Sequence, residues 1–288
     1  PCEIRAFTEL IKLKQGSREN LVIVGYDCPG AFTREDYGAF AKEEGLEATR
    51  RFLSSGVLQG QAPKDGPALA PACQICEQPT PAHADLTIGL FGGEVTVQAD
   101  GAIGEKLFDA LNLSEGAEAI KRQEVVNTLV ESRTAARDKV FEETAAATAS
   151  IEGLTQYVSD CINCYNCRVA CPVCYCKECV MLTDVFEHEP LQYLRWSSQR
   201  GYVKMPTDTT FYHLTRLLHM SLSCVGCGQC SQACPNDIPL LELFRTIGHQ
   251  TQQAFDYEAG NNPEKPLPLS LFEEEEFQEV VGIKQKGA

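Results

Sequence analysis

Cysteine is the residue type in this sequence that is best suited to chemistry. The chain has 288 residues and 15 cysteines, most of which crowd into residues 161–234. Disulfide scaffolds are usually short, and cysteines three residues apart do not bridge one another easily. Clustered thiols in a long, acidic chain therefore indicate metal sites in a reducing compartment rather than a disulfide framework.

Two stretches, 161–172 and 224–235, share the spacing C-x-x-C-x-x-C-x-x-x-C-P. This is the spacing of bacterial ferredoxins, in which three thiolates on one loop bind one [4Fe–4S] cluster and the fourth cysteine binds the other cluster. We therefore predict two clusters. The ligands of the first are Cys161, Cys164, Cys167 and Cys234, and those of the second are Cys171, Cys224, Cys227 and Cys230. Zinc is the alternative, although tetrahedral zinc sites normally take their cysteines two and two.

Three further thiols, Cys174, Cys176 and Cys179, follow the first motif directly. They fall within six residues and have no obvious fourth ligand nearby in the sequence. Three interpretations stay open. The thiols could bind an additional cluster completed by a distant ligand, they could bind zinc, or they could be free thiols packed under the neighbouring clusters.

Four cysteines lie near the N-terminus, at Cys2, Cys28, Cys73 and Cys76. We expect Cys2 to open a helix, Cys28 to end a strand, and the C-x-x-C pair to lie on a loop, which are placements that suit ligands. Together they could hold one more [4Fe–4S] cluster. Buried free thiols with an incidental C-x-x-C, or a zinc site, are the alternatives.

The elements that position these cysteines differ between the two halves of the chain. In the first half, helical spacing predicts helices at 3–15 and 34–54, and a Gly/Pro/Ala-rich loop covers 56–72. The apolar run at 21–28 predicts a buried strand whose end delivers Cys28. Two short strands, 84–90 and 94–100, flank Gly92-Gly93, which is a hairpin signal. This alternation predicts a mixed α/β domain over 1–110.

The second half is predicted to be helical, so the overall fold class is α+β. A helical connector over 111–158 leads into an α-helical ferredoxin domain at 159–250, whose long spacer (180–223) contains two plausible helices. Such a spacer resembles the ferredoxin domains in the iron–sulfur subunits of succinate dehydrogenases and heterodisulfide reductases. Residues 251–288 form an acidic C-terminal tail that we expect to wrap the surface or to be partly disordered; its glutamate run, Glu273 to Glu276, is interpreted as a solvated face.

Composition excludes several classes of function. The net charge of −15 offers no basic surface for a nucleic-acid backbone, and no apolar run approaches the roughly 18 residues of a membrane span. No signal-peptide pattern follows Pro1. No nucleotide-binding glycine motif and no hydrolase motif stands out.

The remaining candidate residues are interpreted mainly as structural. The five histidines have no metal-binding spacing and are expected to be satisfied core or surface residues, with a possible site role only for His83. Trp196, Tyr165 and Tyr175 are expected to pack, and the tyrosines could shield clusters from water.

Several stretches resemble the beta subunits of the coenzyme F420-reducing hydrogenases and dehydrogenases. They are PCEIRA at 1–6, VGYDC at 24–28, ACQIC at 72–76 and AHADLTIGLFG at 82–92. The run CINCYNCRVACPVCYCKECV, beginning at Cys161, is similar to the beta subunits of F420-dependent formate dehydrogenases within that family. The family also has a Gly-rich stretch ahead of PCEIRA, associated with flavin binding, that this sequence does not contain.

The resemblance implies an FAD, iron–sulfur clusters and a cytoplasmic complex. It makes Cys2, Cys28, Cys73 and Cys76 the ligands of a [4Fe–4S] cluster beside the flavin. Asp85 lies in a matching stretch and is a candidate cofactor-binding residue, with a structural cap as the alternative. The implied partners are a molybdenum or tungsten formate-oxidising subunit and coenzyme F420.

Iron–sulfur clusters move single electrons, and a flavin converts them to a hydride pair. The leading hypothesis is therefore an electron-transfer subunit of a formate dehydrogenase-type complex. The alternative is a relay subunit linked to a heterodisulfide reductase-like or hydrogenase module, with no substrate of its own. A zinc-stabilised scaffold is a third hypothesis.

Overall fold

Three short strands form a mixed sheet in the first half of the computed structural model, which describes residues 1–64, 66–113, 116, 119–183, 186, 188–201 and 208–271. The strands are β1 (Val24–Tyr26), β2 (Leu86–Gly89) and β3 (Thr96–Ala99), in the order β1-β2-β3. β1 runs parallel to β2, with Val24 opposite Leu86, and β2 runs antiparallel to β3, with Leu86 opposite Ala99. The predicted hairpin is present, and both glycines of its connection have positive φ.

The prediction that residues 21–28 form a buried strand is wrong in two respects. The strand is only three residues long, and its outward side chains are exposed, at 51% for Val24 and 57% for Tyr26. β1 lies at an edge of the sheet, because the other side of β2 is taken by β3. A run of β-branched residues indicates a strand but does not say whether both of its faces will be covered.

The helices of the first half include those predicted at 3–15 and 34–54, the second of which is interrupted at residues 45–47. They are α1 (Cys2–Lys12), α2 (Arg34–Glu44), α3 (Ala48–Ser54), α4 (Pro71–Gln74) and α5 (Gly101–Ala110), with short 3₁₀ turns η1 (Gly45–Glu47), η2 (Val57–Gln59) and η3 (Phe91–Gly93). The predicted loop at 56–72 therefore contains η2 and the first residues of α4.

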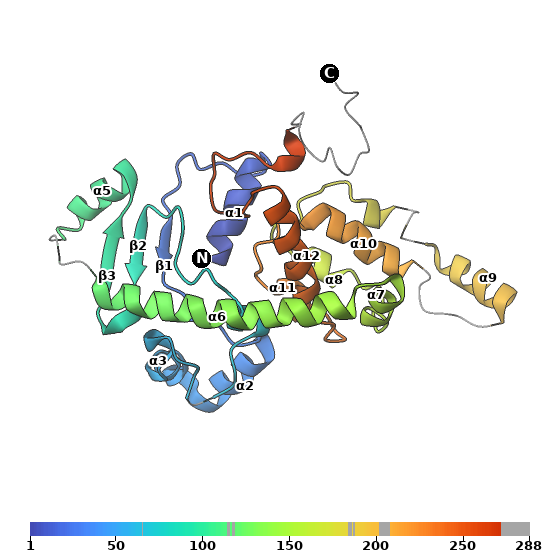
Figure 1. The fold of residues 1–288 in the computed structure, drawn as a ribbon, viewed down its shortest axis with the longest axis horizontal. Helices are drawn as coiled ribbons and strands as arrows, with labels where there is room; N and C mark the ends of the chain where they lie inside the picture. The colour runs from blue at the N-terminus through green and yellow to red at the C-terminus, as the bar shows by residue number, and fades with distance from the viewer. Residues whose placement is uncertain are drawn as a thin grey trace, which may run out of the picture.

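The long helix α6 (Ile120–Ala147) runs beneath the sheet and continues under the second half of the chain (Figure 1). It packs against η3 at one end and against α12 and α7 toward the other. Its N-terminal end is fixed by Arg122, whose guanidinium makes a bidentate pair with the fully buried Asp27, at 2.8 and 2.6 Å. Asp27 also accepts a hydrogen bond from the backbone N–H of Leu90, so this carboxylate joins the helix to the sheet.

The second half is helical, as predicted. Its elements are α7 (Ile151–Tyr157), α8 (Asn166–Val169), η4 (Val180–Leu182), α9 (Pro190–Arg200), α10 (Thr209–Met220), α11 (Gln229–Gln232), α12 (Leu240–Ala254) and η5 (Pro268–Ser270). An offset of 63 residues relates its two parts, since it separates Cys161 from Cys224, the end of α7 from the end of α10, and α8 from α11. The two short helices of this repeat, α8 and α11, pack against each other.

Helix α1 is bound to the second half rather than to the sheet. Ala6 belongs to the same buried core as Leu154 and Leu243. The guanidinium of Arg5 donates hydrogen bonds to the carbonyls of Ala259 and Val225, and the buried Glu9 accepts hydrogen bonds from the hydroxyl of Tyr257 and the N–H of Gly260.

The first part of the predicted tail is packed, because α12 continues to Ala254 and Tyr257 and Ala259 are buried. Glu273 to Glu276 lie outside the described residues. No helix in the described part of the chain has the length and apolar character needed to cross a membrane.

Candidate iron–sulfur centres

The four N-terminal cysteines, although far apart in sequence, lie close together. Cys2 is the first residue of α1, Cys28 follows β1, and Cys73 and Cys76 lie in and just after α4. Burial raises the pKa of Cys73 to about 11, and the charges of Cys28 and Cys76 add to this effect. Burial also raises the pKa of Cys2, with Cys28 and Cys76 again among the neighbours. We call Cys2, Cys28, Cys73 and Cys76 the N-terminal group.

The structure brings Cys234 of the second motif to the loop of the first motif. Cys161, Cys164, Cys167 and Cys234 line one pocket, together with Tyr212 and His213. Burial raises the pKa of Cys161 to about 11, and its thiol neighbours are the other three members of this set. We call these four cysteines the outer group.

Cys171 crosses in the opposite direction, from the first motif to the loop of the second. Burial raises the pKa of Cys227 to about 12, and the charges of Cys224 and Cys171 contribute. The pKa of Cys230 is also raised, by burial first and then by Cys224, Cys227 and Cys171. We call Cys171, Cys224, Cys227 and Cys230 the inner group. Cys2 is a further charged neighbour of Cys227, so the inner group lies beside the N-terminal group.

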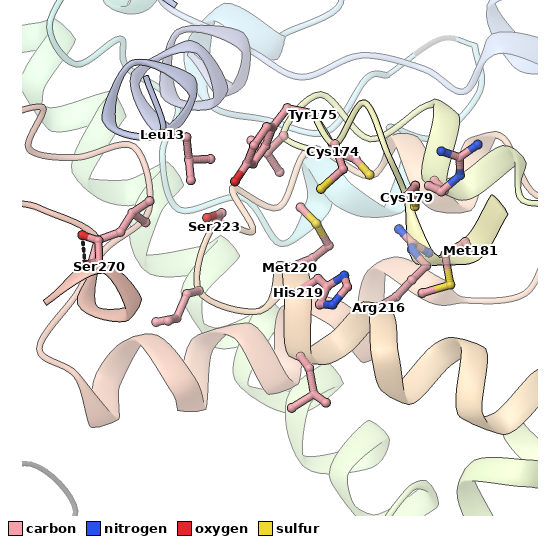
Figure 2. A pocket seen from close by; sticks show the side chains of 16 residues that line it. Leu13, Cys174, Tyr175, Cys179, Met181, Arg216, His219, Met220, Ser223 and Ser270 are labelled. Carbon is pink, nitrogen blue, oxygen red and sulfur yellow. Dashed lines mark hydrogen bonds between the residues drawn. The ribbon is translucent and has the colours of Figure 1, made fainter. Parts of the chain in front are cut away.

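The third set of thiols forms a separate group at a cavity of about 460 Å³ (Figure 2). Burial raises the pKa of Cys174, and Cys179 and Cys176 are its thiol neighbours. All three cysteines lie on the lining, with Met181 and Met220 opposite. Tyr175, expected to be a packing residue, is 41% exposed and also lines this cavity.

The two motif loops have the same backbone shape. Asn163 and Tyr165 of the first loop have φ values of 51° and 61°, and the residues 63 positions later, Gly226 and Gly228, have φ values of 72° and 76°. Left-handed positions between the cysteines let three thiols of one short loop face a common volume, with α8 or α11 beginning immediately afterwards. Glycine is the residue that adopts this region without strain, and asparagine tolerates it.

Two buried arginines, Arg216 and Arg245, are each near thiols of two groups. Burial lowers the pKa of Arg245, but Glu77, Cys224 and Cys76 more than offset this effect, so its guanidinium is near thiols of both the inner and the N-terminal group. Its Nη2 donates to Oε1 of Glu77 at 2.5 Å. Burial alone would lower the pKa of Arg216. The charges of Cys167, Tyr212, Cys230 and Cys171 have the larger combined effect, so the pKa of Arg216 is raised overall. Arg216 is therefore near thiols of both the outer and the inner group.

Two protein-family models match parts of this chain. The family model for the C terminus of the "Coenzyme F420 hydrogenase/dehydrogenase, beta subunit" matches residues 1–152, which is more than half of the chain. This chain belongs to the F420 hydrogenase/dehydrogenase beta-subunit family. A second model, "4Fe-4S binding domain", matches residues 221–239, which include the second motif.

Two relatives match most of this chain, and a third matches about a third of it. The chain is 28% identical to the F420-dependent formate dehydrogenase subunit beta of Methanocaldococcus jannaschii, over 93% of this chain and 74% of that protein. It is 26% identical to F420-dependent formate dehydrogenase 1 subunit beta of Methanococcus maripaludis, over 93% of this chain and 73% of that protein. A shorter match, 32% identical over 107 residues, covers 32% of this chain and 32% of sulfhydrogenase 2 subunit beta of Pyrococcus furiosus.

The cysteines of this family member are not paired in disulfides. All fifteen are free thiols. Among the described residues, no three His, Cys, Asp or Glu side chains come together at a point that could hold a single metal ion. A [4Fe–4S] cluster binds each of its four thiolates through a different iron, so its ligands surround a volume rather than a point.

Sequence reasoning missed the polar residues around the thiols. His213 is fully buried beside the outer group, neither ring nitrogen has a hydrogen-bond partner among the described residues, and burial lowers its pKa to about 4. The expectation that the histidines are satisfied is therefore wrong for His213. Only the spacing of apolar residues along α10 and α12 could have indicated that Arg216 and Arg245 face inward.

Asp85, the candidate cofactor-binding residue of the family resemblance, is buried and already has partners. Its Oδ1 accepts a hydrogen bond from Nη2 of Arg18 at 2.8 Å, and its Oδ2 accepts one from the N–H of Ile23 at 2.7 Å. These contacts hold the segment before β1 in place. His83, two residues earlier, has a buried Nε2 without a partner among the described residues, and its carbonyl accepts a hydrogen bond from Arg18.

Proposed function

We propose that this chain is the electron-transfer beta subunit of a formate dehydrogenase-type complex. In it the N-terminal, inner and outer groups each hold one [4Fe–4S] cluster. The observation that carries the proposal is the exchange of Cys171 and Cys234 between the two motif loops, because it completes two sets of four thiols of the kind found in two-cluster ferredoxins. The two methanogen relatives, matched over most of this chain, are named as F420-dependent formate dehydrogenase beta subunits, which supports the assignment to that type of complex.

The three groups follow one another in space in a defined order. The inner group is next to the N-terminal group, since Cys227 interacts with Cys2 and Arg245 is near both Cys224 and Cys76. The inner group is also next to the outer group, since Arg216 is near both Cys167 and Cys171. The order N-terminal, inner, outer suits a relay in which electrons pass between neighbouring positions.

The protein contributes burial and charge to such a relay. Iron–sulfur clusters supply one-electron transfer, at potentials set by net charge, hydrogen bonds to sulfur and exposure. Arg216 and Arg245 each place positive charge near two groups, which favours the more negative, reduced state of both. The backbone N–H of Ala31 donates to Sγ of Cys73 at 3.3 Å, and the N–H of Asn163 donates to Sγ of Cys161 at 3.4 Å.

An FAD beside the N-terminal group is part of the same proposal. The flavin would couple the one-electron relay to hydride transfer with coenzyme F420, while a molybdenum or tungsten subunit would oxidise formate. On this proposal residues 1–110 form the flavin-side domain, 111–158 the helical connector, 159–250 the ferredoxin domain and 251–288 the tail. Asp85 would act by fixing the segment before β1 rather than by contacting the flavin.

The test is iron, sulfide and flavin quantification on the full chain, purified anaerobically. Three clusters of four irons predict at least about twelve irons per chain and an equal amount of sulfide. Fewer than about eight irons, or zinc in their place, would overturn the proposal. Flavin released on denaturation supports the F420-linked function, whereas iron without flavin would favour a relay subunit with no substrate site of its own.

A further inference from the structure

Cys174, Cys176 and Cys179 lie where the first part of the ferredoxin repeat departs from the second. The residues 63 positions later are Asp237, Pro239 and Glu242, none of which is a thiol. In the second part this region leads into the long helix α12, whereas in the first part it forms an irregular loop that ends in η4. The three thiols are therefore an addition to the two-cluster repeat and are not required by it.

The loop packs against the core through Val173, Cys179 and Met181, and it also borders an open pocket. Its three cysteines and the nearby Met181 line the cavity of about 460 Å³, and Arg216, His219 and Met220 of α10 form another part of the lining (Figure 2). The pocket opens to solvent, since Cys176 is exposed and Leu218 on its lining is 75% exposed. Cavities of about 300–1,000 Å³ are typical of small-molecule and cofactor sites.

A buried, incompletely paired cation faces the same cavity. Arg216 is only 3% exposed and lies on the lining. Its Nη2 donates to the carbonyl of Cys167 at 3.2 Å, but its Nε and Nη1 have no hydrogen-bond partner among the described residues. The Nε of Arg168, on the same lining, is also buried without a partner in the part of the chain that the structure describes. A buried guanidinium with unused donors is strongly unfavourable unless an anion lies beside it.

We propose that Cys174, Cys176 and Cys179 hold an additional iron–sulfur cluster in this cavity through three protein thiolates. Such a cluster is anionic and its sulfides accept hydrogen bonds, so it would lie beside Arg168 and beside Arg216, which also faces the inner and outer groups. Three thiolates bind three irons, which leaves any fourth iron facing the cavity. Cys171 is a close neighbour of Cys174, so the site lies beside the inner group, which the N-terminal and outer groups also neighbour. The inference rests on the proposed function, because it assigns to this group the chemistry proposed for the others.

The experiment compares iron and sulfide in the anaerobically purified full chain with those in a variant that carries Cys174→Ser, Cys176→Ser and Cys179→Ser together. We expect the variant to lose about three to four irons, with matching sulfide, and to retain the roughly twelve irons of the other groups. Those retained irons also show that the rest of the chain has folded. The matched control is Tyr175→Phe, in the same loop without loss of a thiol, which should keep the full iron content.

If the triple variant does not fold, Cys176→Ser alone serves, because Cys176 is exposed and tolerates substitution best. It should lose the same irons. Equal iron in the variant and the unchanged chain would overturn this inference while leaving the relay intact. Zinc that disappears with the three thiols would also overturn it. Absence of iron from the unchanged chain would instead overturn the proposed function itself.

Discussion

The two motif loops share one backbone shape but meet different surroundings. In the second loop, a Cβ on Gly228 would lie 2.4 Å from the Cβ of Ala72, and one on Gly226 would lie 2.5 Å from Cδ of Arg245. In the first loop, Tyr165 and Asn163 occupy the same left-handed positions with full side chains. The second loop is therefore an internal joint between the two halves of the chain, and its glycines are required by contact as well as by φ.

The first loop uses its side chains to support itself. The hydroxyl of Tyr165 donates to the carbonyl of Phe186 at 3.1 Å, and its ring centroid lies 4.8 Å from that of Tyr212. Oδ1 of Asn163 accepts a hydrogen bond from the hydroxyl of Thr209 at 2.9 Å. This loop also has an open side, since Ile162 is 50% exposed whereas its counterpart Val225 is 4% exposed. The comparison shows how one loop design can serve both as a joint and as a surface.

The largest expected effect comes from breaking the exchange between the loops. Cys171→Ser should remove about four irons, because it takes one ligand from the inner group. Adding Cys224→Ser should remove no more, since both belong to one group, whereas adding Cys161→Ser should raise the loss to about eight. Iron quantification on the three variants is the measurement. If Cys171→Ser with Cys161→Ser lost only about four irons, each motif would be serving its own cluster.

The next prediction separates the cost of the steric contact at Gly228 from the cost of its left-handed backbone conformation. Gly228→Ala should lower the free energy of unfolding by about 3 kcal/mol, because left-handed strain adds to the clash with Ala72. Gly201 is the matched control, since its φ of 77° is nearly identical and a Cβ there would meet nothing within 4 Å among the described residues. Gly201→Ala should therefore lower it by only about 1 kcal/mol. Denaturant unfolding under anaerobic conditions measures both, and equal losses would show that the contact with Ala72 does not matter.

A smaller effect is expected on the reduction potentials at the joint. Arg245→Met removes a positive charge beside Cys224 and Cys76, which should lower the potential of the inner or N-terminal position by about 50 mV. Arg137→Gln is the control, because Arg137 also pairs with Glu77, at 3.3 Å, and lies on α6. Redox titration followed by EPR should find the outer position unchanged in both variants. An equal shift at all three positions would mean that Arg245 acts through the fold as a whole.

The smallest effect concerns the side-chain support of the first loop. Tyr165→Phe keeps the ring on Tyr212 and loses the hydrogen bond to Phe186, so it should lower the free energy of unfolding by about 1 kcal/mol. Iron content should not change, because no thiol is affected. Thermal unfolding measures the first quantity and iron analysis the second. Loss of iron from the outer group would show that the hydroxyl is needed to shape the loop.

Spacing along the chain was sufficient to predict which thiols could share a cluster, because cluster loops are local and the exchange of Cys171 and Cys234 follows from the motif. It also predicted the helices, whose apolar residues recur with the helical period. It could not predict Arg216 or Arg245 at the thiols, since their positions depend on how α10 and α12 pack. The exposure of β1 was not predicted for the same reason, because the sequence of a strand does not show which elements will pack against it. The buried, unsatisfied His213 likewise depends on long-range packing.

The hydrogen bonds that join α1 to residues 257–260 have a consequence for how this protein is made. Arg5 and Glu9 are separated from their partners by 254 and 251 residues of chain. Domains usually fold in the order in which they leave the ribosome. Cys2, carried by α1, has no fixed position until the residues around Gly260 have been synthesised. Metal assembly at the N-terminal group should therefore be a late event in the cell. In a stalled or shortened chain, Cys2 would not be in position, and the thiols of Cys28, Cys73 and Cys76 would be open to oxidants without a complete set of ligands.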